Sequence, residues 1–442
     1  MKRVILIVIT VTAIRFYAEA GKPNWKSKIE NANYIHRAIK EITDVMVYDI
    51  YSPPVAARTY AYISVTAYET LIHESHDYIS LAGQLHGLQP SPEPEMAKEY
   101  SYTLAAVHAL LTVGKSLVIS EEKVDAFEKA MLEEFKKDGI PQNVFDNSIA
   151  YGDKMVEHIL AWMSKDNYNY TKSMGAYTVR NDSASWKPTP PVYMKAVEPH
   201  WNQMRTFILD SAQAFKPVKP PHFSIDSSSA FYKEAVEVLK QGNSNTVEQR
   251  NIAQFWDCNP FNVNQRGHVM YAVKKISPGG HWMNITRLAC QKANKGPVAS
   301  AEAYAYVAIT VNDGFIACWD EKYRSVVMRP ETYINQYIDP AWRPVLQTPP
   351  FPEYVSAHSV ISAGASVLLT KLFGKNFSFT DSTEVEFGIP PREFKSFYDA
   401  SKEAGISRYY GGIHYLPAVN YGLDIGKEIG IFVEKEITTR KV

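Results

Sequence analysis

The sequence contains few cysteines and no excess of charge of either sign. Cys258, Cys290 and Cys318 are widely separated among 442 residues, which excludes a disulfide framework and does not form a zinc ligand set. The 47 basic and 47 acidic residues cancel. No overall field therefore favours nucleic acid or an anionic membrane as a partner, and any cationic site must be local.

Long hydrophobic runs are also missing, except at the N-terminus. There Lys2 and Arg3 precede the apolar run "VILIVITVTAI", and "AEA" follows at residues 18–20. This order predicts a secretory signal peptide over residues 1–20 and an exported protein, periplasmic or secreted. The run is too short to span a bilayer comfortably, so we expect no stable membrane insertion after its removal.

Alternating strand patterns are nearly absent, whereas helical periodicity is frequent, and the hydrophobic fraction of 45% suffices for a core. The prediction is an all-α helical bundle forming a single domain over residues 21–442. Within it, residues 21–250 supply N-terminal helices and a proline- and aromatic-rich loop, and residues 251–442 a core bundle. Helices are expected near residues 28–50, 54–74, 96–118, 120–139, 143–164, 229–241, 280–294, 298–322 and 418–437, and in the apolar run after residue 358.

Two local features accompany this pattern. Ser120 is the expected N-cap of its helix, with Gly139 as the stop. Residues 166–226 show little helical periodicity but many aromatic side chains. So long a loop is unusual in a compact domain, and its aromatic content predicts that it packs on the helices.

Three segments in the last third of the chain bring cations and hydrogen-bond donors to helix ends. Lys322 and Arg329 are seven residues apart, so a continuous helix would place them on one face, and Pro330 then interrupts the helix. Ser356 and His358 directly precede an apolar helical run, where free backbone N–H groups can cradle an anion.

The third segment contains Arg408 and His414, with Gly411 and Gly412 between them. A sharp turn at these glycines would bring both side chains to one point. Together the segments suit a tetrahedral oxyanion, because arginine binds paired oxygens and histidine can act as a ligand or proton donor. Each piece alone also fits a solvated helix face, a helix cap or a core histidine.

These segments, in this order and spacing, resemble the type 2 phosphatidic acid phosphatase superfamily. The match is closer to its vanadium-dependent haloperoxidase branch, because "VNDGFIACWDEKYRSVVMRP" has a Trp three residues before the Lys and "FPEYVSAHS" has a Phe five before the Ser. The segments "GDKMVEHILAW", "WKPTPPVYMKAVEPHW" and "FWDCNPFNVNQRGH" are similar to haloperoxidase segments as well. The resemblance covers most of the chain beyond residue 20.

The resemblance implies vanadate as cofactor, with hydrogen peroxide and a halide as substrates and hypohalous acid as product. His414 would bind the vanadium, His358 would act as acid–base residue, and Lys322 would polarise the peroxide. Trp319 and Phe351 would line the halide side. The vanadate oxygens would be held by Lys322, Arg329, Ser356, the N–H group of Ala357 and Arg408.

The sequence departs from the family pattern at two informative positions. Ala418 stands where an acid usually orients the final histidine, so we expect His414 to lack a carboxylate partner unless Asn420 or a backbone carbonyl replaces it. Ala357 replaces a usual glycine, and a left-handed backbone there would cost about 1 kcal/mol or more. Two alternatives stay open: a phosphatase acting on small phosphate esters with His414 as nucleophile, and a non-catalytic oxyanion-binding relative.

Three further residues carry expectations of their own. His268 and His281 flank "VMYAVKKISPGG" and are interpreted as loop histidines packed against aromatic neighbours. Asp313, nine residues before Lys322, lies on the opposite helix face and is expected to serve a neighbouring helix.

Overall fold

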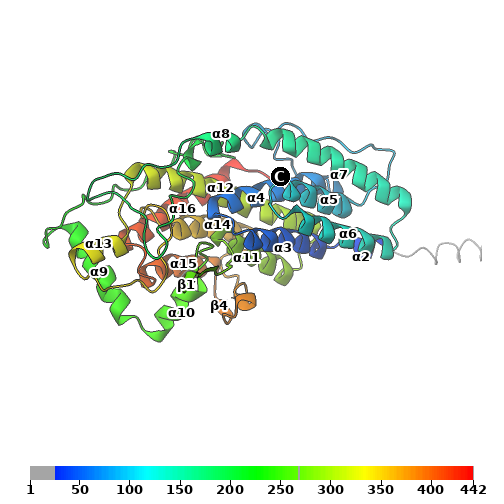
Figure 1. The fold of residues 1–442 in the computed structure, drawn as a ribbon. Coiled ribbons are helices and arrows are strands. Elements are labelled where there is room, and N and C mark those ends of the chain that lie inside the picture. The colour runs from blue at the N-terminus through cyan, green and yellow to red at the C-terminus, as the bar shows by residue number, and fades with distance from the viewer. Residues whose placement is uncertain (1–24, 267–268, 442) are drawn as a thin grey trace, which may run out of the picture.

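The computed structural model describes residues 25–266 and 269–441, and α-helices dominate it (Figure 1). The predicted signal peptide lies outside the described residues. The part of the chain up to residue 244 contains α2 (Trp25–Ile29), α3 (Ala32–Tyr48), α4 (Pro53–Leu71), η1 (Ile72–Glu74), α5 (Tyr102–Lys115), α6 (Glu121–Lys137), α7 (Gln142–Met163), α8 (Tyr168–Ser173), η2 (Trp201–Gln203) and α9 (Ala230–Ser244).

The second half contains α10 (Val247–Phe255), α11 (Pro278–Lys292), α12 (Pro297–Ser325), α13 (Pro330–Tyr337), α14 (Ala357–Phe373), η3 (Val385–Phe387), α15 (Phe397–Tyr410) and α16 (Leu416–Glu436). Two short antiparallel hairpins complete the described fold. They pair β1 (Val263–Arg266) with β2 (Val269–Ala272), and β3 (Phe379–Asp381) with β4 (Arg392–Phe394). The predicted all-α class is confirmed.

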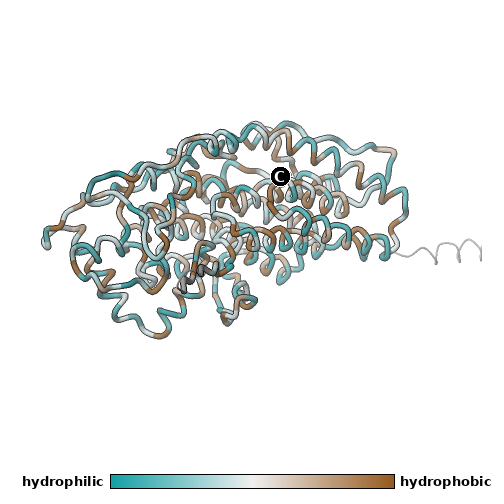
Figure 2. The backbone as a smooth tube through the Cα atoms, in the orientation of Figure 1, coloured by the Kyte–Doolittle hydropathy of each residue, from teal (hydrophilic) through white to brown (hydrophobic). Residues whose placement is uncertain are grey.

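Helix α12 is the central element of the bundle. It packs against α4 and α14, and also contacts α11, α3 and α16 (Figure 1). Both α4 and most of α12 are buried on all sides, as expected for helices that are apolar or small all round. Outer helices such as α7 instead alternate hydrophilic and hydrophobic stretches (Figure 2). One hydrophobic cluster runs from Trp25 to Ile437, and the division near residue 250 stays a prediction.

Helices α14 and α16 approach each other very closely, because α16 has glycines on the facing side. A Cβ atom added to Gly422 would lie 2.9 Å from the carbonyl oxygen of Ser356. One added to Gly426 would lie 2.0 Å from the carbonyl oxygen of Val360. Real Cβ atoms do not come this near, so these glycines set the distance between the helix that begins at Ser356 and the helix that follows His414.

Several local predictions were wrong in detail. Ser120 is the N-cap residue of α6, as predicted, but its side chain makes no capping bond, because its Oγ donates to Asp49 Oδ1 at 2.6 Å. The expected helix at residues 96–118 begins only at Tyr102, after the capping Ser101. The predicted set also omitted α8, α10, α13 and α15, four short or weakly amphipathic helices whose stability depends on tertiary packing.

The long segment 166–226 packs on the helices, as predicted. Trp186, Trp201 and Leu209 in it are buried. Asp313 anchors the segment: its Oδ1 accepts a hydrogen bond from Phe207 N at 2.8 Å, and its Oδ2 accepts from the next two backbone N–H groups at 2.8 and 3.0 Å. The expectation that Asp313 serves a neighbouring helix was therefore wrong, because its partners are backbone groups of this loop.

An Asp313→Asn variant is expected to lose about 2 kcal/mol of unfolding free energy in urea denaturation. The amide keeps one acceptor oxygen, so at least one buried N–H of residues 207–209 loses its partner. The exposed Asp210→Asn change in the same segment should leave the midpoint unchanged. Equal midpoints for both variants would contradict the anchoring role.

Candidate active site

The two cations at the end of α12 do not share a helix face. The helix ends at Ser325, where Val326 follows with a left-handed φ of 52°. Arg329 is the N-cap of α13, with an extended backbone ahead of Pro330. A residue before proline is pushed out of the helical region, which explains the extended backbone of Arg329. Even so, Lys322 and Arg329 both point inward, and their side chains are fully buried.

Lys322 holds the loop that leads into α14. Its Nζ donates to the carbonyl oxygens of Pro352 and Glu353 at 2.9 Å each, and of Val355 at 2.7 Å. All three of its N–H groups therefore have protein acceptors. Burial, reinforced by the charge of Arg329, lowers the pKa of Lys322 to about 7. Lys322 thus acts on the site mainly as a loop anchor and a titratable charge.

Arg329 connects three segments. Its Nε donates to the Phe351 carbonyl at 2.9 Å, and its Nη1 to the Ile413 carbonyl at 2.8 Å. The same Nη1 lies 3.1 Å from Nε2 of His414. Its Nη2 is buried and has no hydrogen-bond partner among the described residues. A buried guanidinium nitrogen without a partner is costly, so it indicates a place for an anionic ligand.

His414 has a carboxylate partner, contrary to the expectation drawn from Ala418. Glu353 Oε1 lies 2.7 Å from His414 Nδ1 and also accepts the backbone N–H of Tyr415 at 3.1 Å. Glu353 is 61 residues before the histidine, so helix spacing could not reveal it. Ala418 instead offers its carbonyl oxygen to the N–H of Ser356 at 3.1 Å.

The two partners of His414 determine how its ring is protonated. Burial, with the nearby Arg329 charge, lowers the pKa of His414 well below its usual value, so the ring is neutral. A proton on Nδ1 faces Glu353, and Nε2 then accepts from Arg329. Burial also raises the pKa of Glu353 to about 7, although Arg329 and Lys322 oppose the rise. The Nε2 lone pair of His414 thus accepts from Arg329 here, and an electrophilic centre could engage it in place of that hydrogen bond.

The start of α14 lies where the sequence placed it. Ser356 is the N-cap and accepts from Ser359 N at 3.3 Å and Ser359 Oγ at 2.9 Å. Ala357 is the first helical residue and has no positive φ, so the backbone strain that a left-handed alanine would carry does not arise. His358 is half-buried, and its Nε2 is enclosed without a partner among the described residues. Burial, followed by the Arg408 charge, lowers its pKa well below the usual value.

The turn at Gly411 and Gly412 brings Arg408 and His414 together, as predicted. Gly412 has a φ of 75°, which a residue with a side chain rarely adopts. The N–H of Ile413 then donates back to the Arg408 carbonyl at 3.2 Å. The Arg408 guanidinium is buried and donates to Ser407 Oγ at 3.0 Å and, from another element, to the Ala253 carbonyl at 3.2 Å.

A small buried cavity of about 30 Å³ lies between these segments. Lys322, Arg329 and Ser356 are not among its lining residues, although the Lys322 amino group lies 5.3 Å from the ring centre of Phe351, which is one. The Trp319 and Phe351 ring centres are 4.9 Å apart. Of the residues nominated from the sequence, the cavity is lined by Trp319, Phe351, Ala357, His358, Arg408 and His414.

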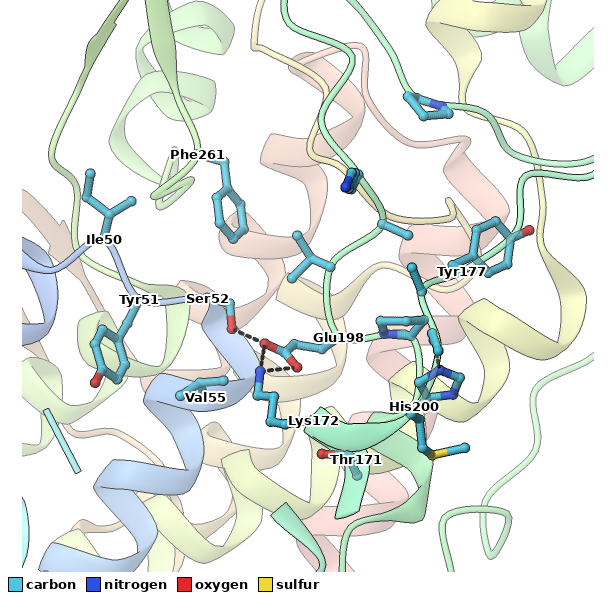
Figure 3. Close-up of a pocket in the computed structure, with 18 of the residues that line it drawn as sticks. Ile50, Tyr51, Ser52, Val55, Thr171, Lys172, Tyr177, Glu198, His200 and Phe261 are labelled. Atoms are coloured by element: carbon cyan, nitrogen blue, oxygen red, sulfur yellow. Dashed lines mark hydrogen bonds and ion pairs between the residues drawn. The ribbon is translucent and has the colours of Figure 1, made fainter. Parts of the chain in front are cut away.

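A wider cleft of about 710 Å³ lies near this cavity (Figure 3). In it the Glu198 carboxylate pairs with Lys172 at 2.6 Å and accepts from Ser52 at 3.3 Å. The cleft and the cavity are lined by residues that are adjacent in sequence. Ser52 and Phe261 line the cleft, whereas Pro53 and Pro260 line the cavity. The aromatic Trp319 also donates its Nε1–H to the carbonyl of Val197, a cleft residue, at 3.2 Å.

The comparisons agree with this geometry. No curated protein matches the sequence. Residues 302–440 match the family model described as the second helical-bundle domain of VCPO. The crystal structure of the first bacterial vanadium-dependent iodoperoxidase is 46% identical, with a TM-score of 0.89, and the match covers 93% of this chain and 98% of that one. The chain belongs to the vanadium-dependent haloperoxidase family.

Two more haloperoxidase structures share the fold at lower identity. The holo form of a bacterial vanadium-dependent chloroperoxidase has a TM-score of 0.66 at 16% identity, covering 87% of this chain and 92% of that one. Its apo form has a TM-score of 0.65 at 16% identity, covering 88% and 96%. The predicted family and enzyme class are thereby confirmed, with vanadate as the family's cofactor.

The residues of this haloperoxidase fit a tetrahedral oxyanion. Arg329 Nη2 and His358 Nε2 are buried polar atoms without partners in residues 25–266 and 269–441. The neutral Nε2 of His414 and the Arg408 guanidinium lie at the same site. An anion bearing several oxygens would supply acceptors for the two arginines and an electrophilic centre for the histidine.

Proposed function

We propose that this haloperoxidase oxidises iodide with hydrogen peroxide, using vanadate held at His414. The carrying observation is the buried His414 ring, which is oriented between Glu353 and Arg329 and lines the cavity. The iodide preference rests on the iodoperoxidase to which the chain is similar over nearly its whole length. Bound vanadate would supply a Lewis acid that activates peroxide toward halide without changing oxidation state.

The chain's own residues have separate roles in this proposal. His414 Nε2 would hold the vanadium, and His358, unpartnered at Nε2, would take and return a proton at that atom. Trp319 and Phe351 form the apolar halide side and exclude water. The oxygens would be held by the buried side chains of Arg329, Ser356 and Arg408 and by the N–H group of Ala357, with the buried Lys322 charge nearby.

Iodide oxidation by purified protein lacking residues 1–20 tests the proposal, with and without added vanadate. We expect vanadate-dependent triiodide formation that is abolished in His414→Ala and unchanged in the control His76→Ala, which alters an exposed histidine. Bromide and chloride in place of iodide establish the halide order. Activity without vanadate, or full activity in His414→Ala, would overturn the proposal.

The same preparation separates the two alternatives. Hydrolysis of an aryl phosphate that vanadate inhibits, without iodide oxidation, would establish the phosphatase. Vanadate binding without either turnover would establish a non-catalytic oxyanion-binding protein. If the protein did not bind vanadate at all, the haloperoxidase, phosphatase and oxyanion-binding hypotheses would all be excluded.

We also propose that the protein is exported, because residues 1–20 have the pattern of a signal peptide. Among the described residues, no helix has both the length and the apolar character needed to cross a bilayer. N-terminal sequencing of protein recovered from outside the cytoplasm should give a chain that begins near residue 21.

The affinity for vanadate should fall as pH rises through neutrality. The pKa of Lys322 is lowered to about 7, so its charge is present below that pH and lost above it. Between about pH 6 and about pH 8.5, we expect the dissociation constant of the wild type for vanadate to rise. This rise should be at least about threefold larger than the rise measured for Lys322→Gln. The variant corrects for the titration of vanadate itself, and identical profiles for both proteins would contradict the role of the charge.

A further inference from the structure

A second cluster of ligand-type side chains lies beside the active-site cavity. Cys258 follows α10, His281 lies in the first turn of α11, and Glu384 follows β3 and is the N-cap of η3. All three are buried, with exposures of 1%, 0% and 2%. Three segments that are distant in sequence therefore place a thiol, an imidazole and a carboxylate at one point.

The distances within the cluster match the edges of a metal-centred tetrahedron. Cys258 Sγ lies 3.3 Å from His281 Nδ1 and 3.8 Å from Glu384 Oε1. His281 Nδ1 lies 3.2 Å from Glu384 Oε1. Tetrahedral zinc bound by sulfur, nitrogen and oxygen at usual bond lengths separates its ligands by about 3.4 to 3.6 Å. The three atoms are thus close to where a bound ion would hold them.

The other ring nitrogen of His281 has the partner that a metal-binding histidine needs. Its Nε2 lies 2.7 Å from Asp381 Oδ2. Asp381 is itself fixed, because Oδ1 accepts from Thr383 N at 2.9 Å and Thr383 Oγ1 at 2.6 Å. A proton held on Nε2 by this carboxylate leaves the lone pair of Nδ1 directed at the thiol and Glu384.

We propose that Cys258, His281 and Glu384 bind one zinc-class divalent cation, with Asp381 positioning the imidazole. Thiolate, imidazole and carboxylate together select a borderline-soft ion such as Zn²⁺ over Mg²⁺ or Ca²⁺. A water molecule would take the fourth position. The mutual spacing of the three cysteines predicted no zinc ligand set. The partners of Cys258 are instead a histidine 23 residues away and a glutamate 126 residues away.

The proposed ion would stiffen the wall behind the acid–base histidine. Cys258 lines the cavity together with His358. Between the two clusters lies Trp256, whose ring stacks on His281 with ring centres 4.5 Å apart and whose backbone forms a hydrogen bond with His358. This inference does not rest on the proposed iodide oxidation, because its ligands are separate from the vanadate residues.

Metal analysis of the full folded chain tests the site. Protein stripped with a chelator would be titrated with Zn²⁺, and separately with Co²⁺, whose thiolate charge-transfer band reports sulfur ligation. We expect one equivalent per chain in the wild type and in Cys290→Ser, which removes another buried thiol. Cys258→Ser should lose the cobalt–thiolate band, and Asp381→Asn should weaken binding about 10- to 100-fold.

The titration of the wild-type protein decides the matter even if a variant fails to fold. No stoichiometric binding by folded, stripped protein would overturn the site and leave a hydrogen-bonded imidazolium between two carboxylates. A cobalt–thiolate band that persists in folded Cys258→Ser would overturn it too. Vanadate binding, measured on the same samples, reports the state of the other site separately.

Discussion

A Glu353→Ala variant is expected to lose about 10- to 100-fold in vanadate affinity and in vanadate-dependent iodide oxidation. Glu353 is the carboxylate that orients His414, at 2.7 Å from Nδ1, and it also holds the adjacent Tyr415 N–H. Without it the imidazole can rotate or change tautomer, and Nε2 no longer presents a fixed lone pair. Vanadate titrations and initial rates measure both effects.

Glutamine at this position gives a sharper test. Burial raises the pKa of Glu353 to about 7, so the wild-type carboxyl is increasingly protonated below that pH and ionised above it. Glu353→Gln resembles the protonated form, so its rate should approach that of the wild type at low pH and fall behind as pH rises through about 7.

A matched control exists in Glu331→Gln, which alters a buried carboxyl that bonds Thr348 and does not contact His414. The rate of this variant should depend on pH in the same way as the rate of the wild type. A Glu353→Ala protein within twofold of the wild type would show that His414 needs no carboxylate.

A Gly426→Ala variant is expected to lose about 3 kcal/mol or more of unfolding free energy, or to fail to fold. The new Cβ would lie 2.0 Å from the Val360 carbonyl oxygen and 2.8 Å from its Cα. These are backbone atoms of α14, so no rotamer change relieves the clash and the two helices must separate. Urea denaturation measures the loss.

Gly314→Ala provides the control, because it also adds a methyl group on a helix facing α14. Its Cβ would meet Val360 Cγ1 at 3.5 Å and Ile361 Cγ2 at 3.7 Å, which are ordinary contacts. We expect a change within about 1 kcal/mol, since the gain in helix propensity offsets small packing shifts. If both variants were equally stable, close approach of α14 and α16 would not be required.

Separation of α14 and α16 should also reach the active site. Ser356 begins α14 and donates its N–H to Ala418 in α16, four residues after His414. A folded Gly426→Ala protein should therefore bind vanadate more weakly than Gly314→Ala. That result would connect helix packing to the geometry of the oxyanion site.

The amino-acid sequence by itself determined the helical class, the central buried helix at residues 298–322 and the identity of the cavity residues Arg408, His358 and His414. These follow from local information: apolar periodicity, helix-start residues, and a glycine pair that forces a turn. Short-range spacing also indicated that Ser356 caps a helix, which it does.

Only the tertiary structure determined which side chains become hydrogen-bond partners. Glu353 reaches His414 across 61 residues, and Lys322 gives its three N–H groups to a loop about 30 residues away. Cys258 contacts His281 and Glu384 directly, and His281 in turn contacts Asp381. Such contacts depend on how helices pack and on which buried polar atoms must find partners, and one sequence carries no local signal for either.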